Sequence, residues 1–175
     1  GSRDAPRCAR GPALRTDHGV YAIRYAGIDE MKQVEQWLAM NKAKNFEEWQ
    51  AAMALNHIQS FNFVYANRHG DIHFIHNAQL PVRAPGWNWQ QYLPGDRSDL
   101  IWNAYYPTDA LPQVTNPPSG FIHSANQTPF NVTSAAHNPL KTDAPADGGW
   151  QTRMTNRATR GLELFEEFGQ ISDEE

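Results

Sequence analysis

The first part of the chain changes from an alternating pattern to helical spacing. From His18 to Tyr25 the side chains fall into two alternating sets, which predicts a strand that ends at Gly27. A helix is expected next, from Glu30 to about Lys42, with Asp29 as its N-cap. The apolar stripe that this helix is predicted to bury consists of Met31, Val34 and Leu38, with Trp37 beside them.

A second short helix is predicted directly after the first. Asn45 is a suitable N-cap, and Glu47 and Glu48 stand in the first turn, where the helix dipole favours carboxylates. The helix is expected to reach about Leu55. The residues that it is predicted to bury are Phe46, Trp49 and Met53. Two short helices in sequence indicate a helical hairpin.

The next segment has a period of two. Phe61–Asn67 and Asp71–Asn77 are rich in aromatic and β-branched residues, and a turn at residues 68–70 joins them, which predicts a β-hairpin. His73 and His76 are the closest pair of histidines in it. Residues three apart on a strand point to opposite faces, so this pair is not expected to share a metal ion.

Residues 79–147 show no regular period. Prolines recur throughout, and Trp87–Tyr106 holds many Trp and Tyr residues. Because a disordered linker is poor in aromatic residues, we expect a long ordered loop with one short strand at Gly120–Ser124. A closing helix is predicted from about Gly149 to Phe168. Its expected inner face comprises Met154, Ala158, Gly161, Phe165 and Phe168.

Composition narrows the class of protein. The 175 residues suit one domain, and a net charge of −4 with scattered basic residues argues against a nucleic-acid partner. No apolar run is long enough for a membrane span, and the single cysteine, Cys8, excludes an internal disulfide framework. Residues 1–13 are expected to be a disordered or tag-derived leader, residues 14–169 the domain and residues 170–175 an acidic tail.

One segment departs from ordinary loop chemistry. Ser124–Pro129 places Asn126 and Gln127 where a predicted strand ends, and an Asn amide fixed there could donate to an oxyanion. The alternative is that both amides satisfy backbone groups of a turn. Neither a G-x-S-x-G elbow nor a Gly-rich phosphate loop occurs in the sequence.

Basic residues recur along the closing helix. Arg153, Arg157 and Arg160 share one face, and Glu163 and Glu167 continue it. This pattern fits a solvated face with mixed charge pairs, or one arginine that points into a site.

Several segments resemble, in order along the chain, the penicillin amidase (acylase) family. Ser60–Ile72 is similar to the family's QNFVYADRDGNI hairpin, and Leu80–Arg83 is similar to its IPVR. Asn116–Ile122 resembles its NPPSGFI segment, which leads into Asn126–Pro129. The resemblance covers roughly residues 14–168.

This resemblance implies an α+β fold, part of the αββα sandwich of N-terminal nucleophile hydrolases. The parent enzyme would hydrolyse a linear amide of a small-molecule N-acyl substrate with a Ser whose own α-amine is the base. Asn126 matches the family's oxyanion-hole Asn, and Arg157 best matches the Arg that supports it, with Arg153 the less favoured match. Ser124 replaces the first Asn of the family motif, which puts its supporting hydrogen bonds in question.

The resemblance also defines what lies elsewhere. The nucleophile, the α chain and most calcium ligands would lie upstream, so this chain is expected to be an internal β-chain fragment that is inactive alone. Its expected partners are the rest of the β chain and the α chain of the same precursor. No cofactor is implied within the fragment, although the intact enzyme could bind calcium. Placement in the periplasm or outside the cell is implied by the family only.

Two further expectations remain. A sheet cut from a larger sandwich exposes edges and an apolar face, which predicts self-association of the fragment. The alternative function is a non-catalytic binding or assembly module, in which the aromatic residues of Trp87–Tyr106 contact a sugar or a peptide.

Overall fold

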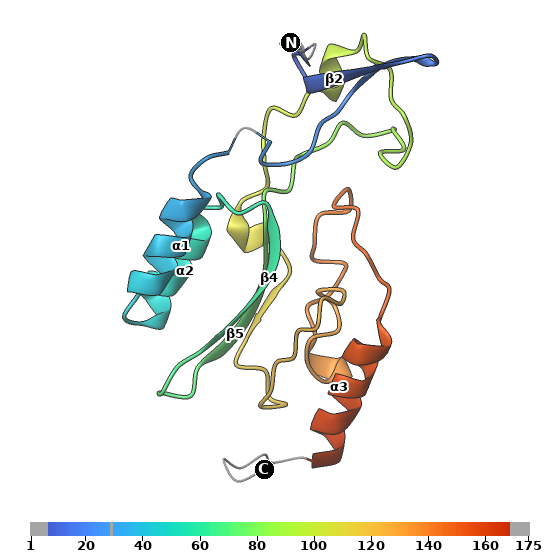
Figure 1. Ribbon diagram of the computed structural model, residues 1–175. Helices are drawn as coiled ribbons and strands as arrows, with labels where there is room; N and C mark the ends of the chain where they lie inside the picture. Colours follow the sequence, from blue (N-terminus) through green and yellow to red (C-terminus); the bar gives the residue numbers. More distant parts are fainter. Residues whose placement is uncertain (1–6, 29, 169–175) are drawn as a thin grey trace.

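The computed structural model describes residues 7–28 and 30–168, and its mixture of helices and strands confirms the predicted α+β class. The strands form two separate antiparallel sheets, β1-β2-β3 and β4-β5-β6. Figure 1 shows helices α1 and α2 on one side of β4 and β5, with α3 on the other side. Much of the irregular chain between β6 and α3 lies between the second sheet and α3.

The first sheet begins earlier in the chain than expected. Its strands are β1 (Arg7–Cys8), β2 (Gly11–Thr16) and β3 (Gly19–Ala22), so β3 is shorter than the predicted strand. Residues 7–13, expected in a disordered leader, therefore include paired strands. Arg7 and Cys8 pair with Pro12 and Gly11, and Ala13 pairs with Ala22 of β3, so these residues are ordered by strand pairing and not by a pattern of their own. Residues 1–6 of the expected leader and the acidic tail lie outside the described residues.

Helix α1 spans Gln33–Lys42 and buries a different face from the one predicted. Met31 and Val34 are 87% and 74% exposed, whereas Gln36 is completely buried, so the predicted apolar stripe is wrong. Asp29, the expected N-cap, lies outside the described residues, and the observed cap, Lys32, makes no side-chain cap hydrogen bond.

The buried Gln36 explains this orientation of α1. Its Nε2 donates to Asn77 Oδ1 at 2.9 Å, and its Oε1 accepts from the backbone N–H groups of His57 and Ile58 at 2.7 and 3.0 Å. A buried side chain that satisfies three polar groups is stable, because each of those groups would otherwise be buried without a partner. The hydrogen bonds of Gln36 to the segment that follows α2 therefore determine which face of α1 is buried, in spite of the apolar spacing within that helix.

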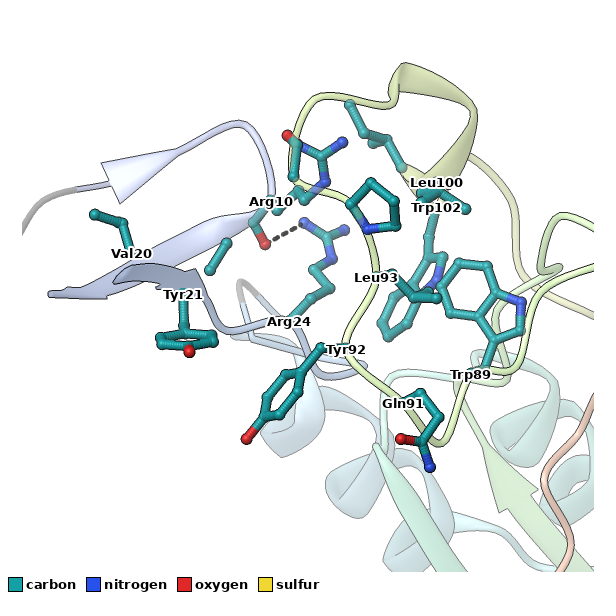
Figure 2. A pocket seen from close by; sticks show the side chains of 14 residues that line it. Arg10, Val20, Tyr21, Arg24, Trp89, Gln91, Tyr92, Leu93, Leu100 and Trp102 are labelled. Atoms are coloured by element: carbon teal, nitrogen blue, oxygen red, sulfur yellow. Dashed lines mark hydrogen bonds between the residues drawn. The ribbon is translucent and has the colours of Figure 1, made fainter. Parts of the chain in front are cut away.

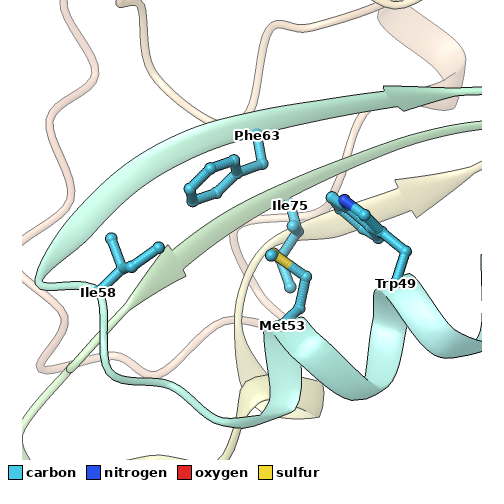
Figure 3. Packing of buried hydrophobic residues seen from close by; sticks show 5 residues of the cluster. All are labelled: Trp49, Met53, Ile58, Phe63 and Ile75. Carbon is cyan, nitrogen blue, oxygen red and sulfur yellow. The ribbon is translucent and has the colours of Figure 1, made fainter. Parts of the chain in front are cut away.

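Helix α2 spans Phe46–Ala54 and agrees with the prediction. Asn45 Oδ1 accepts from Glu48 N at 2.8 Å, the expected N-cap bond. The helix packs on the second sheet through a core shown in Figure 3. This core comprises Trp49, Met53, Ile58, Phe63 and Ile75. Each large apolar side chain buried there contributes about 2 kcal/mol to stability.

The second sheet is built on the predicted hairpin. Strands β4 (Ser60–Ala66) and β5 (Ile72–Ala78) pair over their full length, and β6 (Gln113–Thr115) joins the other side of β5. His73 lies on the helix side, with its ring 5.6 Å from that of Trp49. His76 lies on the opposite face, as the alternation predicts.

Two predicted elements differ in the structure. Gly120–Ser124 forms no strand. The backbone N–H of His123 donates to the backbone oxygen of Val132, but the backbone oxygen of Phe121 accepts from the side-chain hydroxyl of Thr133 instead of from a backbone N–H group. Helix α3 spans Asn156–Phe168 and so begins seven residues later than Gly149. Gly149 has φ of +67°, which is incompatible with the expected start of a helix at that residue.

The docking face of α3 is partly as predicted. Ala158 is buried, and the Phe165 ring stacks on Phe121 with centroids 4.8 Å apart. Met154 precedes the helix, and Phe168 is 59% exposed, so these two residues do not belong to the packed face. Within the described residues, no helix has the length and apolar character needed to cross a membrane.

Candidate functional site

A cavity of about 740 Å³ opens on the face of the second sheet that points away from α1 and α2. The sheet contributes Ser60, Asn62 and His76, and two loops close the cavity from the other side. One loop carries Asn126, and the other carries Trp150. Ala26 also lines the cavity, which therefore brings together residues from five separate segments of the chain.

Asn126 occupies a special backbone conformation in the first loop. Its φ is +60°, in the left-handed region that Asn tolerates better than most residues with a Cβ. The guanidinium of Arg157, 31 residues later on α3, donates from Nη2 to Asn126 Oδ1 at 3.0 Å. The same Nη2 donates to the backbone oxygen of Ala125 at 2.9 Å.

These contacts set the direction of the Asn126 amide. Because its Oδ1 accepts from Arg157, its Nδ2 points away from that guanidinium. Within residues 7–28 and 30–168, no acceptor lies in hydrogen-bond range of this Nδ2, and Asn126 lines the cavity. The two N–H groups are thus available to a ligand.

Gln127 holds the same loop from inside. It is only 5% exposed, and its Nε2 donates to the backbone oxygens of His123 and Asn131 at 2.8 and 3.0 Å. Its Oε1 accepts from Ala125 N. The support expected from a second Asn at Ser124 is therefore supplied by Gln127, which bonds to the backbone on both sides of Asn126.

Side-chain hydrogen bonds join the second sheet to the Asn126 loop. Asn62 Nδ2 donates to the backbone oxygen of Gln127 at 3.2 Å, and Asn62 Oδ1 lies 2.7 Å from His76 Nδ1. His76 Nε2 lies 3.4 Å from Ser60 Oγ. Burial lowers the pKa of His76 to about 4, so the ring is neutral at pH 7.

Trp150 forms an aromatic wall of the cavity. Its ring meets His76 edge to face at 5.7 Å and Phe130 at 5.8 Å, and its Nε1 donates to the backbone oxygen of Pro145 at 2.8 Å. The sequence assigned Trp150 to the closing helix. It lies instead in the loop before that helix, where it shapes the cavity.

The three arginines of the closing segment have different surroundings. Arg157 contacts Asn126, whereas Arg160 forms ion pairs with Glu163 and Glu167 at 3.1 and 3.0 Å. The solvated face of mixed charges is thus the environment of Arg160. Arg153 precedes the helix.

Sequence reasoning did not identify Asn62, His76 or Trp150 as residues of the site. The contacts of Gln127 match the alternative in which an amide of this segment satisfies turn backbone groups. The alternation of the hairpin already placed Asn62 and His76 on the same face, and this pattern could have indicated them. Trp150 gave no comparable pattern, because its position depends on the loop conformation.

Among the residues that the structure describes, no group of three or more His, Cys, Asp or Glu side chains is arranged to hold a metal ion.

A second, smaller cavity of about 350 Å³ lies between the first sheet and the loop that contains the aromatic residues of Trp87–Tyr106 (Figure 2). Trp89 and Trp102 line it, and the guanidinium of Arg24 lies 5.5 Å from the ring centre of Trp102. Arg10 donates to the backbone oxygens of Gly95 and Arg97 and so ties the loop to the first sheet. Trp89 and Trp102 therefore pack against other parts of the molecule, whereas Tyr92 is 88% exposed.

Comparison with known proteins identifies the family of the chain. The family model described as penicillin amidase matches residues 2–175. The chain belongs to the penicillin amidase family. Penicillin G acylase of Escherichia coli is 31% identical over 127 residues, which cover 70% of this chain and 15% of that protein.

A solved structure has a similar fold. The thermostable penicillin G acylase from Alcaligenes faecalis superposes with a TM-score of 0.75 at 23% identity, over 96% of this chain and 29% of that chain. The chain thus spans less than a third of the length of either penicillin G acylase.

Proposed function

We propose that the parent protein hydrolyses a linear amide and releases an acyl group from an amine, and that this chain supplies the oxyanion-hole side of the active site. Membership of the penicillin amidase family supports the reaction type. The observation that carries the role of this chain is the Arg157–Asn126 hydrogen bond of 3.0 Å, which leaves the Asn126 amide nitrogen free at the cavity.

The chemistry of this role follows from charge development. When a nucleophile attacks an amide carbon, the carbonyl oxygen becomes negative, and a donor already aimed at it lowers the barrier. Asn126 would supply that donor. Arg157 would act as a positioning residue, because it holds Oδ1 and contributes positive charge close to the developing oxyanion.

The nucleophile is proposed to come from another part of the parent protein, as the family resemblance implies: an N-terminal Ser whose α-amine accepts its proton. We therefore expect the isolated chain to show no amide turnover. Release of the amine by purified chain, above a control that carries Asn126→Ala, would contradict this expectation.

The test of the proposed function is Asn126→Ala in the intact parent enzyme. We expect kcat to fall by about 10²–10³, the usual cost of removing one oxyanion donor, with only a small decrease in melting temperature, since Ala is strained at the φ of +60° that Asn126 adopts. Asn131→Ala is the matched control, because its side chain makes no hydrogen bond within residues 7–28 and 30–168. Near-normal turnover by Asn126→Ala would exclude the proposed role.

The binding-module alternative rests on the aromatic cavity in Figure 2. It predicts that a sugar or peptide ligand protects Trp89 and Trp102 from fluorescence quenching, and that turnover is absent from the parent as well. Amide hydrolysis by the parent that depends on Asn126 would exclude it as the main function.

A further inference from the structure

The sheet side of the main cavity presents two hydrogen-bonding groups that the proposed reaction does not use. Ser60 is exposed, and its Oγ lies 3.4 Å from His76 Nε2. This distance is at the long limit for a hydrogen bond that involves a hydroxyl group. The hydrogen bond between Ser60 and His76 is therefore weak, and both groups can bind a ligand.

The neighbours of His76 determine which of its nitrogens is an acceptor. Asn62 donates from Nδ2 to the backbone oxygen of Gln127, so its Oδ1 faces the histidine and can only accept. The proton of the imidazole must then reside on Nδ1, which donates to Asn62 at 2.7 Å. Nε2 is left with a lone pair directed toward Ser60.

The same three residues follow the order of a Ser-His-Asn triad, but their environment opposes base catalysis. A base that activates serine becomes an imidazolium, and a carboxylate beside Nδ1 normally stabilises that charge. Here Nδ1 faces the neutral amide of Asn62, and burial disfavours protonation of His76. The arrangement suits binding better than proton abstraction.

The charges around the cavity define the donor that fits this pair. Arg83 is the one charged residue among the side chains that line it, and no carboxylate lines it within the described residues. A substrate ammonium group would therefore have no counter-ion there. A neutral hydroxyl can donate to His76 Nε2 and accept from Ser60, and Trp150 offers an apolar wall for the carbon skeleton next to it.

We propose that Ser60 and His76 form a specificity subsite that binds a neutral hydroxyl group of the N-acyl substrate. This proposal rests on the proposed function, since the subsite shares its cavity with Asn126. It makes the parent enzyme selective for hydroxylated amides over the corresponding amides that lack the hydroxyl.

The experiment compares matched substrates with the intact parent enzyme. One series consists of p-nitroanilides of arylacetic and straight-chain acids, each with and without one hydroxyl. A second series keeps the acyl group constant and places the hydroxyl on the amine. In at least one pair we expect the hydroxyl to raise kcat/KM about five- to tenfold, the usual effect of one neutral hydrogen bond.

The variants Ser60→Ala and His76→Phe test whether these residues cause the preference. For the preferred pair, each variant is expected to bring the ratio of kcat/KM with the hydroxyl to kcat/KM without it close to one. A merely structural defect would lower kcat/KM for both substrates by the same factor and leave this ratio unchanged. Ser124→Ala removes a hydroxyl elsewhere on the cavity wall and is expected to keep the ratio.

Two results would overturn the proposal: no pair with a preference in either series, or a preference that both variants retain. Its failure is separable from failure of the proposed function. Asn126→Ala should lower turnover of all substrates by a common factor, and that result is independent of the hydroxyl ratio. Labelling of Ser60 by a fluorophosphonate with loss of turnover would show a nucleophile instead of a binding group, and would also overturn the proposal.

Discussion

At the scale of single residues, the loop around Asn126 shows why a motif can be found in sequence while its support is missed. The consecutive amides and the following Pro129 identified the loop. Asn126 faces the cavity, whereas Gln127 is buried. This difference depends on the left-handed backbone conformation of Asn126, which the sequence does not specify.

Replacement of Gln127 by Met tests this difference between the two residues. The substitution keeps the volume of the side chain but removes its hydrogen bonds to Ala125, His123 and Asn131. We expect kcat of the parent enzyme to fall about tenfold with little change in KM, because the misplaced donor acts mainly in the transition state. Gln91→Met, at an exposed position, is the control. A higher KM with normal kcat would show that Gln127 serves substrate binding.

The buried histidines give the chain a predictable response to acid. Burial lowers the pKa of His73 and His76 to about 4, below the ordinary value of 6.5. Between these values the unfolded chain binds protons that the native chain does not, so the free energy of unfolding falls as the pH falls from 6.5 toward 4. The expected loss at pH 5 is about 2 kcal/mol per histidine.

Urea titrations of the parent at pH 7.5 and pH 5 measure this loss, and NMR titration of the two imidazoles checks its origin. Both rings should remain neutral at pH 5. Normal titration near pH 6.5 would show that these histidines are not the cause of acid sensitivity.

At the scale of elements, the predictions succeeded where local pattern and tertiary packing agree. The α2 helix and the β4–β5 hairpin follow from an Asn cap, a change of period and a Gly-containing turn. The α1 face was predicted wrongly because three polar groups outside the helix require Gln36. The α3 start was predicted too early because Gly149 and Trp150 belong to the cavity loop.

The packing of α3 against the loop also determines how Arg157 reaches Asn126. Gly161 lies against the imidazole of His123, and a Cβ at this position would collide with that ring. His123 is also the residue whose backbone oxygen accepts from Gln127. The close approach of helix and loop therefore sets the position of Arg157 relative to Asn126.

Gly161→Ala is expected to weaken this contact although Ala favours helix by about 1 kcal/mol. Overpacking costs typically 1–3 kcal/mol, so the net effect on stability is small or negative, but kcat should fall as Arg157 shifts. Thr159→Ala, at an exposed position on the same helix, is the control. A more stable variant with full activity would show that the helix–loop distance is not critical.

At the scale of the whole molecule, several large apolar side chains are exposed on one helix and beside it. Met31, Val34, Trp37 and Leu38 are exposed on and beside α1, and β4 forms an open edge of its sheet. In the parent, other segments are expected to cover these surfaces.

We therefore expect the isolated chain to associate with itself. Light scattering after size exclusion should give a mass above 19.8 kDa, and the double variant Val34→Glu/Leu38→Lys should shift it toward the monomer. Leu140→Lys, which changes an exposed Leu elsewhere, should leave the mass unchanged. A monodisperse monomer with a cooperative melt would mark the chain as an autonomous domain.

The most direct test of the central claim is the single-turnover rate of acyl transfer in the intact parent, measured at saturating substrate for the Asn126→Ala variant. We expect this rate to fall by about 10²–10³ while substrate affinity changes little, because the lost donor acts on the transition state. An acyl-transfer rate equal to that of the unmodified enzyme would contradict the assignment of this chain to the oxyanion side of an amide hydrolase.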